Sequence, residues 1–435
     1  MNPPYLTRRT LQFGLAGLMM SPTLALFGCG GSDGGDCPDL TASITTTQTA
    51  NALIEAATLK QWVDEGKLNN SDPASLDRVI VVTVGTPAQY SAQHIPGSQL
   101  LNASTELLMT RLEGVGTIGN MVLDGPSMDA VIQRLSINSH TTIVFVASKN
   151  QNILNATRAY FTFRYWGFPK ERLKVLNGGE NGWEAAAAAG WPTTLALTTA
   201  ATPVLSPSTF SVKNFYNGST TANFALRASI GEMLTLVDKI NDGSQAVNAS
   251  GVSILDERGG SPAVYMQNAG VDDYAQYSLS GTGNTSTFKP VADLQARLNT
   301  FGVTDAKSMI YVYCASGVRS SSAFFVLDGI LGWKVTLYDG SWNQWSAYAS
   351  TATANKVAAA WQTDANTAGT TISRTLGAIT PAGTGVVLDP IANALYSAVN
   401  DRRANQMLNE DKAYFTSGSG SSTPGGDGGS GPSGC

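Results

Sequence analysis

The sequence predicts an α/β protein in which two consecutive domains each contain a parallel β-sheet with helices on both faces, followed by a C-terminal helical extension. Short β-branched runs alternate with helical stretches, which is typical of such sheets. The same order of segments occurs twice, which predicts two homologous domains. The chain has 435 residues, enough for about two or three domains of roughly 100–200 residues each.

The first 29 residues have the composition of an export signal. Arg8 and Arg9 give a positively charged start, and the apolar stretch that follows is short for a membrane span. The sequence Leu-Phe-Gly-Cys at positions 26–29 resembles the lipobox of bacterial lipoproteins, in which a lipid is attached to the cysteine. We therefore expect lipidation at Cys29 and anchoring in the cell envelope, at the outer membrane if the host is Gram-negative. An ordinary signal peptide is the alternative.

Low-complexity segments flank the folded region on both sides. Residues 30–49 form a flexible tether that contains Cys37. Residues 416–435 form a Gly/Ser-rich tail that ends in Cys435. In the preferred interpretation these two cysteines form a disulfide in an oxidising compartment. In the alternative, Cys435 accepts sulfur from the reactive cysteine discussed below.

The first predicted domain covers residues 50–200. Its apolar, β-branched run at 79–84 and a second run at 142–146 predict buried strands, and a helix is predicted near 154–166. His94 lies between the two strands. Since this domain has no candidate nucleophile, we expect His94 to bond backbone groups rather than to act as a base.

The second predicted domain covers residues 205–350 and repeats this order of segments. Val252–Arg258 and Met309–Tyr313 predict strands, and a helix is predicted from about 319 to 331. Functional residues of parallel sheets lie at the carboxyl ends of strands. The loop between the second strand and this helix is therefore where we expect the chemistry.

That loop begins with a cysteine and consists of Cys314, Ala315, Ser316, Gly317, Val318 and Arg319. A free thiol has a pKa of about 8.5, so a thiolate at neutral pH needs stabilisation. A tight loop at a helix N-terminus directs backbone N–H groups inward and adds the positive end of the helix dipole. Gly317 lets the backbone curl closely, and the small residues before it leave the pocket open. Arg319 adds a positive charge at the rim or braces the loop.

These segments resemble the rhodanese family. Val252–Arg258, the loop that begins at Cys314 and Asp339–Trp342 occur in the order of a rhodanese domain, and the first copy has the similar stretches Thr86–Tyr90 and His94–Gly97. The resemblance covers roughly 300 residues in two copies. It is the tandem arrangement of thiosulfate and 3-mercaptopyruvate sulfurtransferases, so the resemblance implies two tandem rhodanese-like domains.

The resemblance also implies the chemistry. Cys314 corresponds to the family's nucleophile, which takes sulfur from a small anionic donor as a persulfide and passes it to a thiol or cyanide-like acceptor. Arg258 and the loop residues Ala315, Ser316, Gly317, Val318 and Arg319 correspond to the groups that bind the donor. No cofactor and no metal are expected.

The two copies differ from each other and from the family pattern. Ala147 stands in the first domain where the second has Cys314, and Thr83 stands where the second has Asp256. The first domain is therefore predicted to be catalytically silent, like the inactive half of tandem sulfurtransferases. Ala315 and its neighbour Ser316 replace the two basic loop residues of typical thiosulfate enzymes, which leaves the identity of the donor open.

Cys314 allows other interpretations, and Trp342 and Trp345 allow two. Cys314 could be an inert buried thiol. A phosphatase or arsenate reductase would need a histidine before the cysteine and five residues between cysteine and arginine, whereas Tyr313 precedes Cys314 and four residues intervene. Trp342 and Trp345 are expected to pack the end of the second domain, with lining of the cleft as the alternative.

Composition limits the possible partners. The formal net charge of −5, with no basic patch, argues against nucleic-acid binding, and two histidines without a C-x-x-C motif argue against zinc or haem. Residues 351–415 match neither copy, and Asp389–Phe415 predicts a helix that packs across the domains or onto a partner. The competing function is therefore a non-enzymatic lipoprotein that acts as a scaffold or binding module in a cell-envelope redox complex.

Overall fold

The computed structural model describes residues 51–72, 74–113, 116–218, 222–241, 243–262, 265–266, 268–281, 283–349 and 405–419. The leader, the tether, residues 351–404 and the end of the tail lie outside these ranges, and with them Cys29, Cys37 and Cys435. Lipidation and the disulfide therefore stay predictions. Within the described ranges, no helix is both long and apolar enough to span a membrane.

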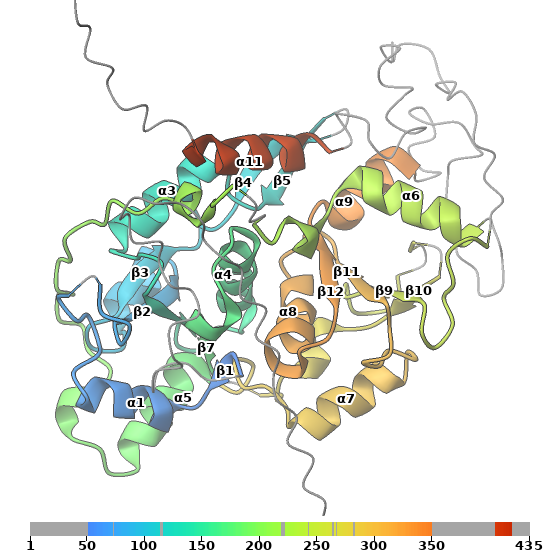
Figure 1. Ribbon diagram of the computed structural model, residues 1–435. Coiled ribbons are helices and arrows are strands. Elements are labelled where there is room, and N and C mark those ends of the chain that lie inside the picture. The colour runs from blue at the N-terminus through green and yellow to red at the C-terminus, as the bar shows by residue number, and fades with distance from the viewer. Residues whose placement is uncertain are drawn as a thin grey trace, which may run out of the picture. The chain divides into compact units, whose positions relative to one another are not determined.

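The first half of the described chain contains a five-stranded parallel sheet (Figure 1). In spatial order its strands are β1 (Leu53–Ile54), β7 (Leu173–Leu176), β6 (Thr142–Ala147), β2 (Val79–Gly85) and β3 (Gln99–Asn102). β2 and β6 are buried along their whole length, because a central parallel strand is covered on both faces. The two strands predicted for this half are confirmed.

The second half contains another five-stranded parallel sheet with the same topology. In the matching order its strands are β8 (Arg227–Ala228), β12 (Val335–Tyr338), β11 (Met309–Tyr313), β9 (Val252–Asp256) and β10 (Ala269–Val271). Each strand therefore has a counterpart at the same place in the first sheet. This duplication confirms the predicted α/β class with two parallel-sheet units.

Helices cover both faces of the first sheet. One face carries α1 (Ala56–Asp64) and α5 (Gly179–Ala188), and the other carries α3 (Gly125–Arg134) and α4 (Leu154–Tyr165). Successive residues of β2 separate the two cores: Val79 and Val81 pack under α1 and α5, whereas Ile80 and Val82 pack under α3 and α4. A short helix, α2 (Pro87–Ala92), follows β2 directly.

The second sheet is covered in the same way. One face carries α6 (Ile230–Asn241) and α9 (Ser341–Ala349), and the other carries α7 (Val291–Asn299) and α8 (Ser320–Phe324). α8 continues as a π-helix over Phe325–Leu331, so the helix predicted from about 319 to 331 is present with a wider last part. Short 3₁₀ turns occur at Lys170–Arg172, Thr193–Leu195, Val212–Phe215, Phe224–Leu226, Tyr274–Tyr277 and Ser417–Ser419.

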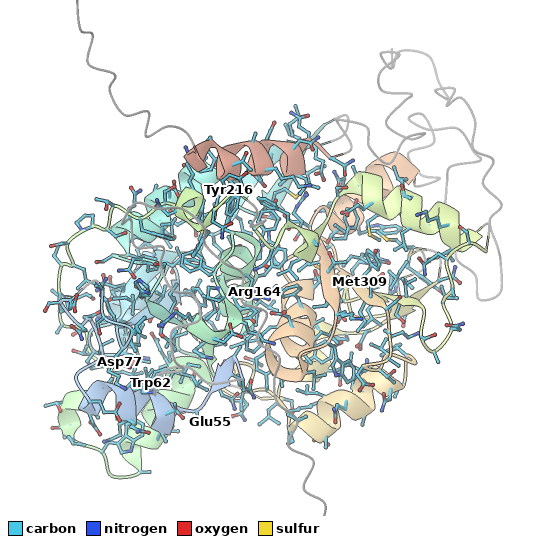
Figure 2. All side chains as sticks on the ribbon, viewed as in Figure 1. Glu55, Trp62, Asp77, Arg164, Tyr216 and Met309 are labelled. Carbon is cyan, nitrogen blue, oxygen red and sulfur yellow. The ribbon has the colours of Figure 1, made fainter. Side chains whose placement is uncertain are left out.

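The two halves meet through equivalent helices, α4 and α8, which share one apolar core. The rings of Phe161 and Phe324 lie 4.9 Å apart, and the Tyr160 hydroxyl donates to Asp328 Oδ2 at 2.7 Å. Arg164, labelled in Figure 2, reaches the same carboxylate at 3.0 Å. Apolar packing and buried ion pairs therefore fix α4 against the helix that follows the cysteine loop.

Two additions to the repeat lie against both halves. The hairpin of β4 (Met109–Glu113) and β5 (Gly116–Met121) belongs to the first half, and α11 (Gln406–Thr416) packs on it (Figure 1). Arg111 of β4 binds the Asp411 carboxylate of α11 with two hydrogen bonds of 2.9 and 2.7 Å. Before α11, Asn405 accepts a hydrogen bond from Ser229 of the second half. The described end of the extension therefore packs across both halves, which was one of the two predicted alternatives.

The segment that joins the halves contacts the first one. Ser208 donates its backbone N–H to Gln133 O at 3.0 Å, and Val212 N donates to Asp129 Oδ1 at 2.8 Å. These residues fall inside the predicted range 205–350 of the second domain. The domain boundaries themselves stay predictions.

Candidate active site around Cys314

Cys314 lies at the carboxyl-end edge of the second sheet. It is the first residue after β11, Glu257 is the first after β9, and Asp339 is the first after β12. Because β9, β11 and β12 are parallel neighbours, the three residues begin loops at one edge, which is where ligands bind in open α/β sheets. The Cys314 side chain is a free thiol with no exposed surface.

The loop backbone is tied to the start of α9. Cys314 N–H donates to the Ser341 hydroxyl at 3.2 Å, Trp342 N–H donates to Cys314 O at 2.9 Å, and Asn343 N–H donates to Ala315 O at 2.9 Å. The first free N–H groups of a helix are thus bonded to the first two loop carbonyls. Three other residues of the loop, Ala315, Ser316 and Val318, are half-buried.

Gly317 is required by the space around the loop. Its φ is +78°, which favours glycine, and a Cβ at this position would lie 2.7 Å from Asp339 O. The glycine therefore lets the loop backbone approach the turn after β12, as the sequence predicts.

An arginine from the first half holds this turn in place. Arg158 of α4 has no exposed surface, donates from Nη1 to Gly317 O at 3.1 Å, and donates from Nη2 to Asn120 O at 3.0 Å. Its Nη2 also forms an ion pair with Asp339 Oδ1 at 2.7 Å, although without the alignment of a hydrogen bond. The half without a cysteine therefore supports the cysteine loop of the other half.

Asp339 belongs to a buried charge network. Its Oδ2 accepts from Val122 N at 2.8 Å and lies 3.4 Å from Arg227 Nε. Arg227 in turn binds both oxygens of Glu113, at 3.1 and 2.9 Å. All three charged side chains are buried, so each charge has opposite charges beside it to offset the loss of hydration.

Arg258 and Arg319 lie beside the loop, and both have partners in the protein. Arg258 binds the Asp256 carboxylate, with Nη2 2.6 Å from Oδ2, and its guanidinium stacks on the Trp342 ring at 4.2 Å. Arg319 Nη1 donates to Arg258 O at 2.6 Å, and its guanidinium lies 5.7 Å from the Tyr274 ring centre. Arg319 therefore braces the loop, one of its two predicted roles. Donor binding by Arg258 stays a prediction.

The two tryptophans differ in position. Both belong to α9. Trp345 is fully buried in the core between this helix and the sheet, whereas Trp342 is partly buried at the edge of that core and contacts Arg258. Both pack the end of the second half, as expected.

A buried cluster of carboxyl groups lies next to the cysteine. Glu257, Asp256 and Asp272 have almost no exposed surface. Burial, then the charge of Asp272 and that of Asp256, raise the pKa of Glu257 well above its ordinary value. A negative charge on Cys314 acts in the same direction. Burial and these neighbouring charges therefore favour the neutral form of Glu257.

The matching position in the first half holds no nucleophile. Ala147 ends β6, and the following loop is closed by Glu180, which accepts from Thr83 Oγ1 at 3.0 Å and from Lys149 N–H at 2.8 Å. Thr83 stands where the second half has Asp256. These contacts fill the space at the end of the sheet with a carboxyl group, in keeping with the predicted silence of this half.

Glu180 makes the stability of the protein dependent on pH. Burial raises the pKa of Glu180 to about 7, so between its ordinary pKa of about 4.3 and pH 7 the folded state binds more protons than the unfolded state. This contribution is fully present below that range and is lost as the pH rises through about 7, by about 3 kcal/mol at most. Chemical unfolding at pH 5 and pH 8.5 should therefore show a smaller stability loss in Glu180→Gln than in the wild type. Equal losses would contradict this assignment.

His94 has a structural environment. Its Nδ1 lies 2.9 Å from Tyr90 O, its ring stacks on the Tyr90 ring at 4.0 Å, and its backbone pairs with Thr198. These contacts agree with the expectation that His94 bonds backbone groups.

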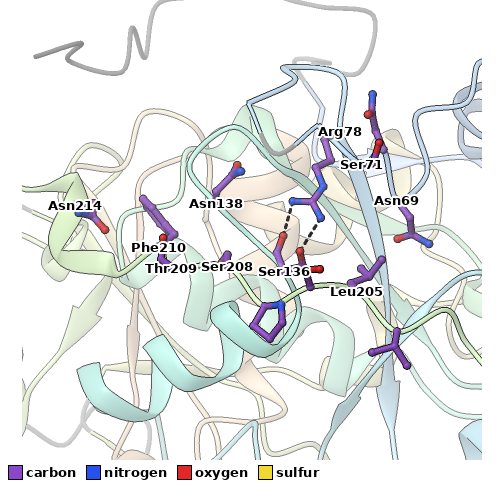
Figure 3. A pocket seen from close by; sticks show the side chains of 14 residues that line it. Asn69, Ser71, Arg78, Ser136, Asn138, Leu205, Ser208, Thr209, Phe210 and Asn214 are labelled. Atoms are coloured by element: carbon purple, nitrogen blue, oxygen red, sulfur yellow. Dashed lines mark hydrogen bonds between the residues drawn. The ribbon is translucent and has the colours of Figure 1, made fainter.

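Of two cavities lined by described residues, one borders the cysteine loop. A cavity of about 710 Å³ is lined by residues of the first half and the joining segment, among them Arg78, whose guanidinium donates to Ser136 (Figure 3). Its described lining includes no residue of the cysteine loop. A second cavity, of about 430 Å³, lies between residues 150–154 of the first half and the segment around Tyr274 of the second. Because Tyr274 contacts Arg319, this smaller cavity is the one that borders the site.

Known proteins with similar sequences support the assignment of this region. Residues 245–348 match the family model described as Rhodanese-like domain. The sulfur carrier protein TtuD of Thermus thermophilus is 27% identical over 273 residues, which cover 59% of this chain and 83% of that protein. The thiosulfate sulfurtransferase YnjE of Escherichia coli is 24% identical over 306 residues, which cover 68% of this chain and 64% of that protein.

Solved structures share the fold. The crystal structure of YnjE superposes with a TM-score of 0.50 and 17% identity, over 68% of this chain and 66% of that chain. A persulfide form of an EanB variant with ergothioneine superposes with a TM-score of 0.51 and 16% identity, over 68% of each chain. Together these findings establish a rhodanese-like α/β fold and support, at low identity, a function in the sulfurtransferase family.

Proposed function

We propose that the protein is a sulfurtransferase that carries sulfane sulfur on Cys314. It takes the sulfur from a small anionic donor of the thiosulfate or 3-mercaptopyruvate class and passes it to a thiol or cyanide-like acceptor. One observation carries the proposal: Cys314 opens a loop that is fixed from several sides, at the ligand-binding edge of the sheet, inside the segment that matches the rhodanese-like domain.

The reaction has two steps on the same sulfur atom. The Cys314 thiolate attacks the transferable sulfur of the donor and a sulfur–sulfur bond forms, while the bond from that sulfur to the rest of the donor breaks and the rest leaves with the electron pair. The acceptor then attacks the outer sulfur of the persulfide and releases the Cys314 thiolate. The free enzyme and the persulfide form alternate, which is the ping-pong scheme of covalent catalysis.

The surroundings of the loop fit an anionic persulfide. Burial favours the neutral form of Glu257, which does not repel a negative charge on Cys314, and Arg258 and Arg319 are cations beside the loop. An anionic donor that uses the Arg258 guanidinium must share it with Asp256. The cavity bordered by Tyr274 is the proposed approach for donor and acceptor, since it lies between the halves and next to Arg319.

The non-enzymatic alternative loses part of its basis. It relied on the unmatched extension, and the described helix α11 packs on the chain's own halves. Export and lipid attachment at Cys29 remain compatible with sulfur transfer, which would then take place in the cell envelope.

Steady-state kinetics test the proposal. Initial rates are measured with thiosulfate and with 3-mercaptopyruvate as donors, at several fixed concentrations of cyanide or dithiothreitol as acceptor. We expect turnover with at least one donor and parallel lines in double-reciprocal plots, because no complex of donor and acceptor together forms. Absence of turnover with both donors, or lines that intersect, would refute the proposal.

A further inference from the structure

Glu257 and Cys314 follow the ends of two neighbouring, paired strands. Asp256 of β9 and Tyr313 of β11 are paired in register, and Glu257 N–H donates to Tyr313 O at 2.7 Å. Side chains at paired positions of neighbouring strands share one face of the sheet, and the next residues share the other. The Tyr313 hydroxyl accordingly donates to Asp256 Oδ2 at 2.7 Å. Glu257 and Cys314 are the next residues after this pair, so the same alternation directs both side chains to the opposite face.

The hydrogen bonds around Tyr277 are compatible with a proton on Glu257. The Tyr277 hydroxyl lies 2.7 Å from Asp272 Oδ2 and 3.0 Å from Glu257 Oε1. It has one proton, so it donates to one carboxyl and accepts from the other. Asp272 Oδ1 also accepts from Arg297 Nε at 2.7 Å and from Asp273 N–H at 2.6 Å, whereas Tyr277 is the one described hydrogen-bond partner of the Glu257 carboxyl. When Tyr277 donates its proton to Asp272, the second of these hydrogen bonds requires a proton on Glu257.

The other oxygen of this carboxyl has no partner. Glu257 Oε2 is buried and makes no hydrogen bond to any residue that the structure describes. Buried polar atoms of folded proteins are nearly always bonded, so an exception needs an explanation. A half-turn about the last side-chain torsion, which has two equivalent orientations, exchanges the two oxygens and presents the proton on the unpartnered side.

We propose that Glu257 donates a proton to the leaving group of a carbon-based sulfur donor at Cys314. This inference rests on the proposed sulfurtransferase function and specifies its donor class, a β-mercapto ketone such as 3-mercaptopyruvate. Its carbon–sulfur bond breaks toward an enolate, which must gain a proton to become the product. Sulfite, which leaves thiosulfate, needs none.

The proton and electron balance closes on Glu257 alone. The Cys314 thiolate attacks the donor sulfur, the sulfur–sulfur bond forms, and the electron pair of the carbon–sulfur bond passes to carbon. The enolate carbon takes the proton of Glu257 and becomes the methyl group of pyruvate. The proton of the donor thiol remains on the new persulfide and then passes to the Glu257 carboxylate. The products are pyruvate, a Cys314 persulfide anion and neutral Glu257, without an external acid, oxidant or reductant.

The test compares two donors in Glu257→Gln, which keeps the size, the neutral charge and a donor group for Tyr277. For each donor, the rate of persulfide formation is measured in a single turnover with the full-length protein. We expect the rate with 3-mercaptopyruvate to fall about 100-fold, and the loss with thiosulfate to be at least about tenfold smaller. Glu257→Asp, which retains an acid, should recover part of the rate with 3-mercaptopyruvate.

Glu180→Gln is the matched control, because it makes the same change at a buried carboxyl of the silent half. It should affect both donors alike. Equal losses with both donors in Glu257→Gln, or no loss with 3-mercaptopyruvate, would overturn the inference and leave the proposed function standing. A wild type that forms a persulfide only from thiosulfate would also overturn it. A wild type that forms none from either donor would instead refute the proposed function.

Discussion

Replacing Cys314 with serine is expected to abolish sulfur transfer. The substitution keeps the shape of the buried side chain but removes the only atom in the described site that can hold sulfane sulfur, so kcat should fall on the order of 10³-fold or more. Stability should change little, because Cys314 contributes a small buried side chain and its loop is held by backbone groups. Turnover assays with both donors, together with thermal unfolding, measure the two effects.

Cys435→Ser is the control for this substitution. It lies outside the described residues, and with cyanide as acceptor it should leave turnover intact even if Cys435 accepts sulfur in the native protein. Residual turnover above about a tenth of the wild-type rate in Cys314→Ser would contradict the assigned nucleophile.

Replacing Arg158 with methionine is expected to have the largest effect on stability. The guanidinium is fully buried and binds Gly317, Asn120 and Asp339 at once, so its loss leaves carbonyl oxygens and part of a carboxylate without partners. Removing one member of a buried ion pair costs about 3–5 kcal/mol. Urea unfolding should report a loss of this size. Activity should fall on the order of 100-fold, since the loop loses a fixed anchor.

A surface arginine of the same half provides the comparison. Arg134 pairs with Glu106, and its side chain is 45% exposed, so Arg134→Met should change stability by less than about 1 kcal/mol. If Arg158→Met lost no more than Arg134→Met, the first half would not support the cysteine loop in the way described above.

Much of the fold could be predicted from the sequence. The β-branched runs at 79–84 and 309–313 correspond to central strands, because such strands are buried on both faces and so read as continuous apolar runs. The edge strands β1, β8 and β10 have two or three residues each, too few to produce a pattern. The hairpin β4–β5 lacks a repeat counterpart and alternates polar and apolar residues only weakly, so it was not predicted either.

The site could be predicted only in part. The loop from Cys314 to Arg319 is contiguous in the chain, and its order of strand, cysteine, glycine and helix is visible in the sequence. Arg158, in contrast, is 159 residues away from Gly317, and no local pattern distinguishes it from a surface arginine of α4. Glu257 did have a signal, an acidic pair at the end of a buried strand, but its raised pKa follows from burial and from Asp272, and its bond to Tyr277 also arises only in the fold.

Arg258 illustrates a different limit. Its position after β9 follows from the strand pattern, but the sequence does not show that its guanidinium turns onto Asp256 and Trp342. The short distance between residues 256 and 258 allows this local ion pair, and packing of α9 places the ring over it. An anionic donor that binds the Arg258 guanidinium has to share it with Asp256 or displace Asp256 from it.

The most direct measurement is the mass of the Cys314 peptide after the protein is treated with a donor. The purified full-length protein is incubated with thiosulfate or 3-mercaptopyruvate without reductant, digested under conditions that preserve persulfides and compared with an untreated sample. The account predicts an added mass of about 32 Da, one sulfur atom, on the Cys314 peptide, and its removal by cyanide. No added mass with either donor, or added mass only on another cysteine, would contradict the claim that Cys314 carries sulfane sulfur.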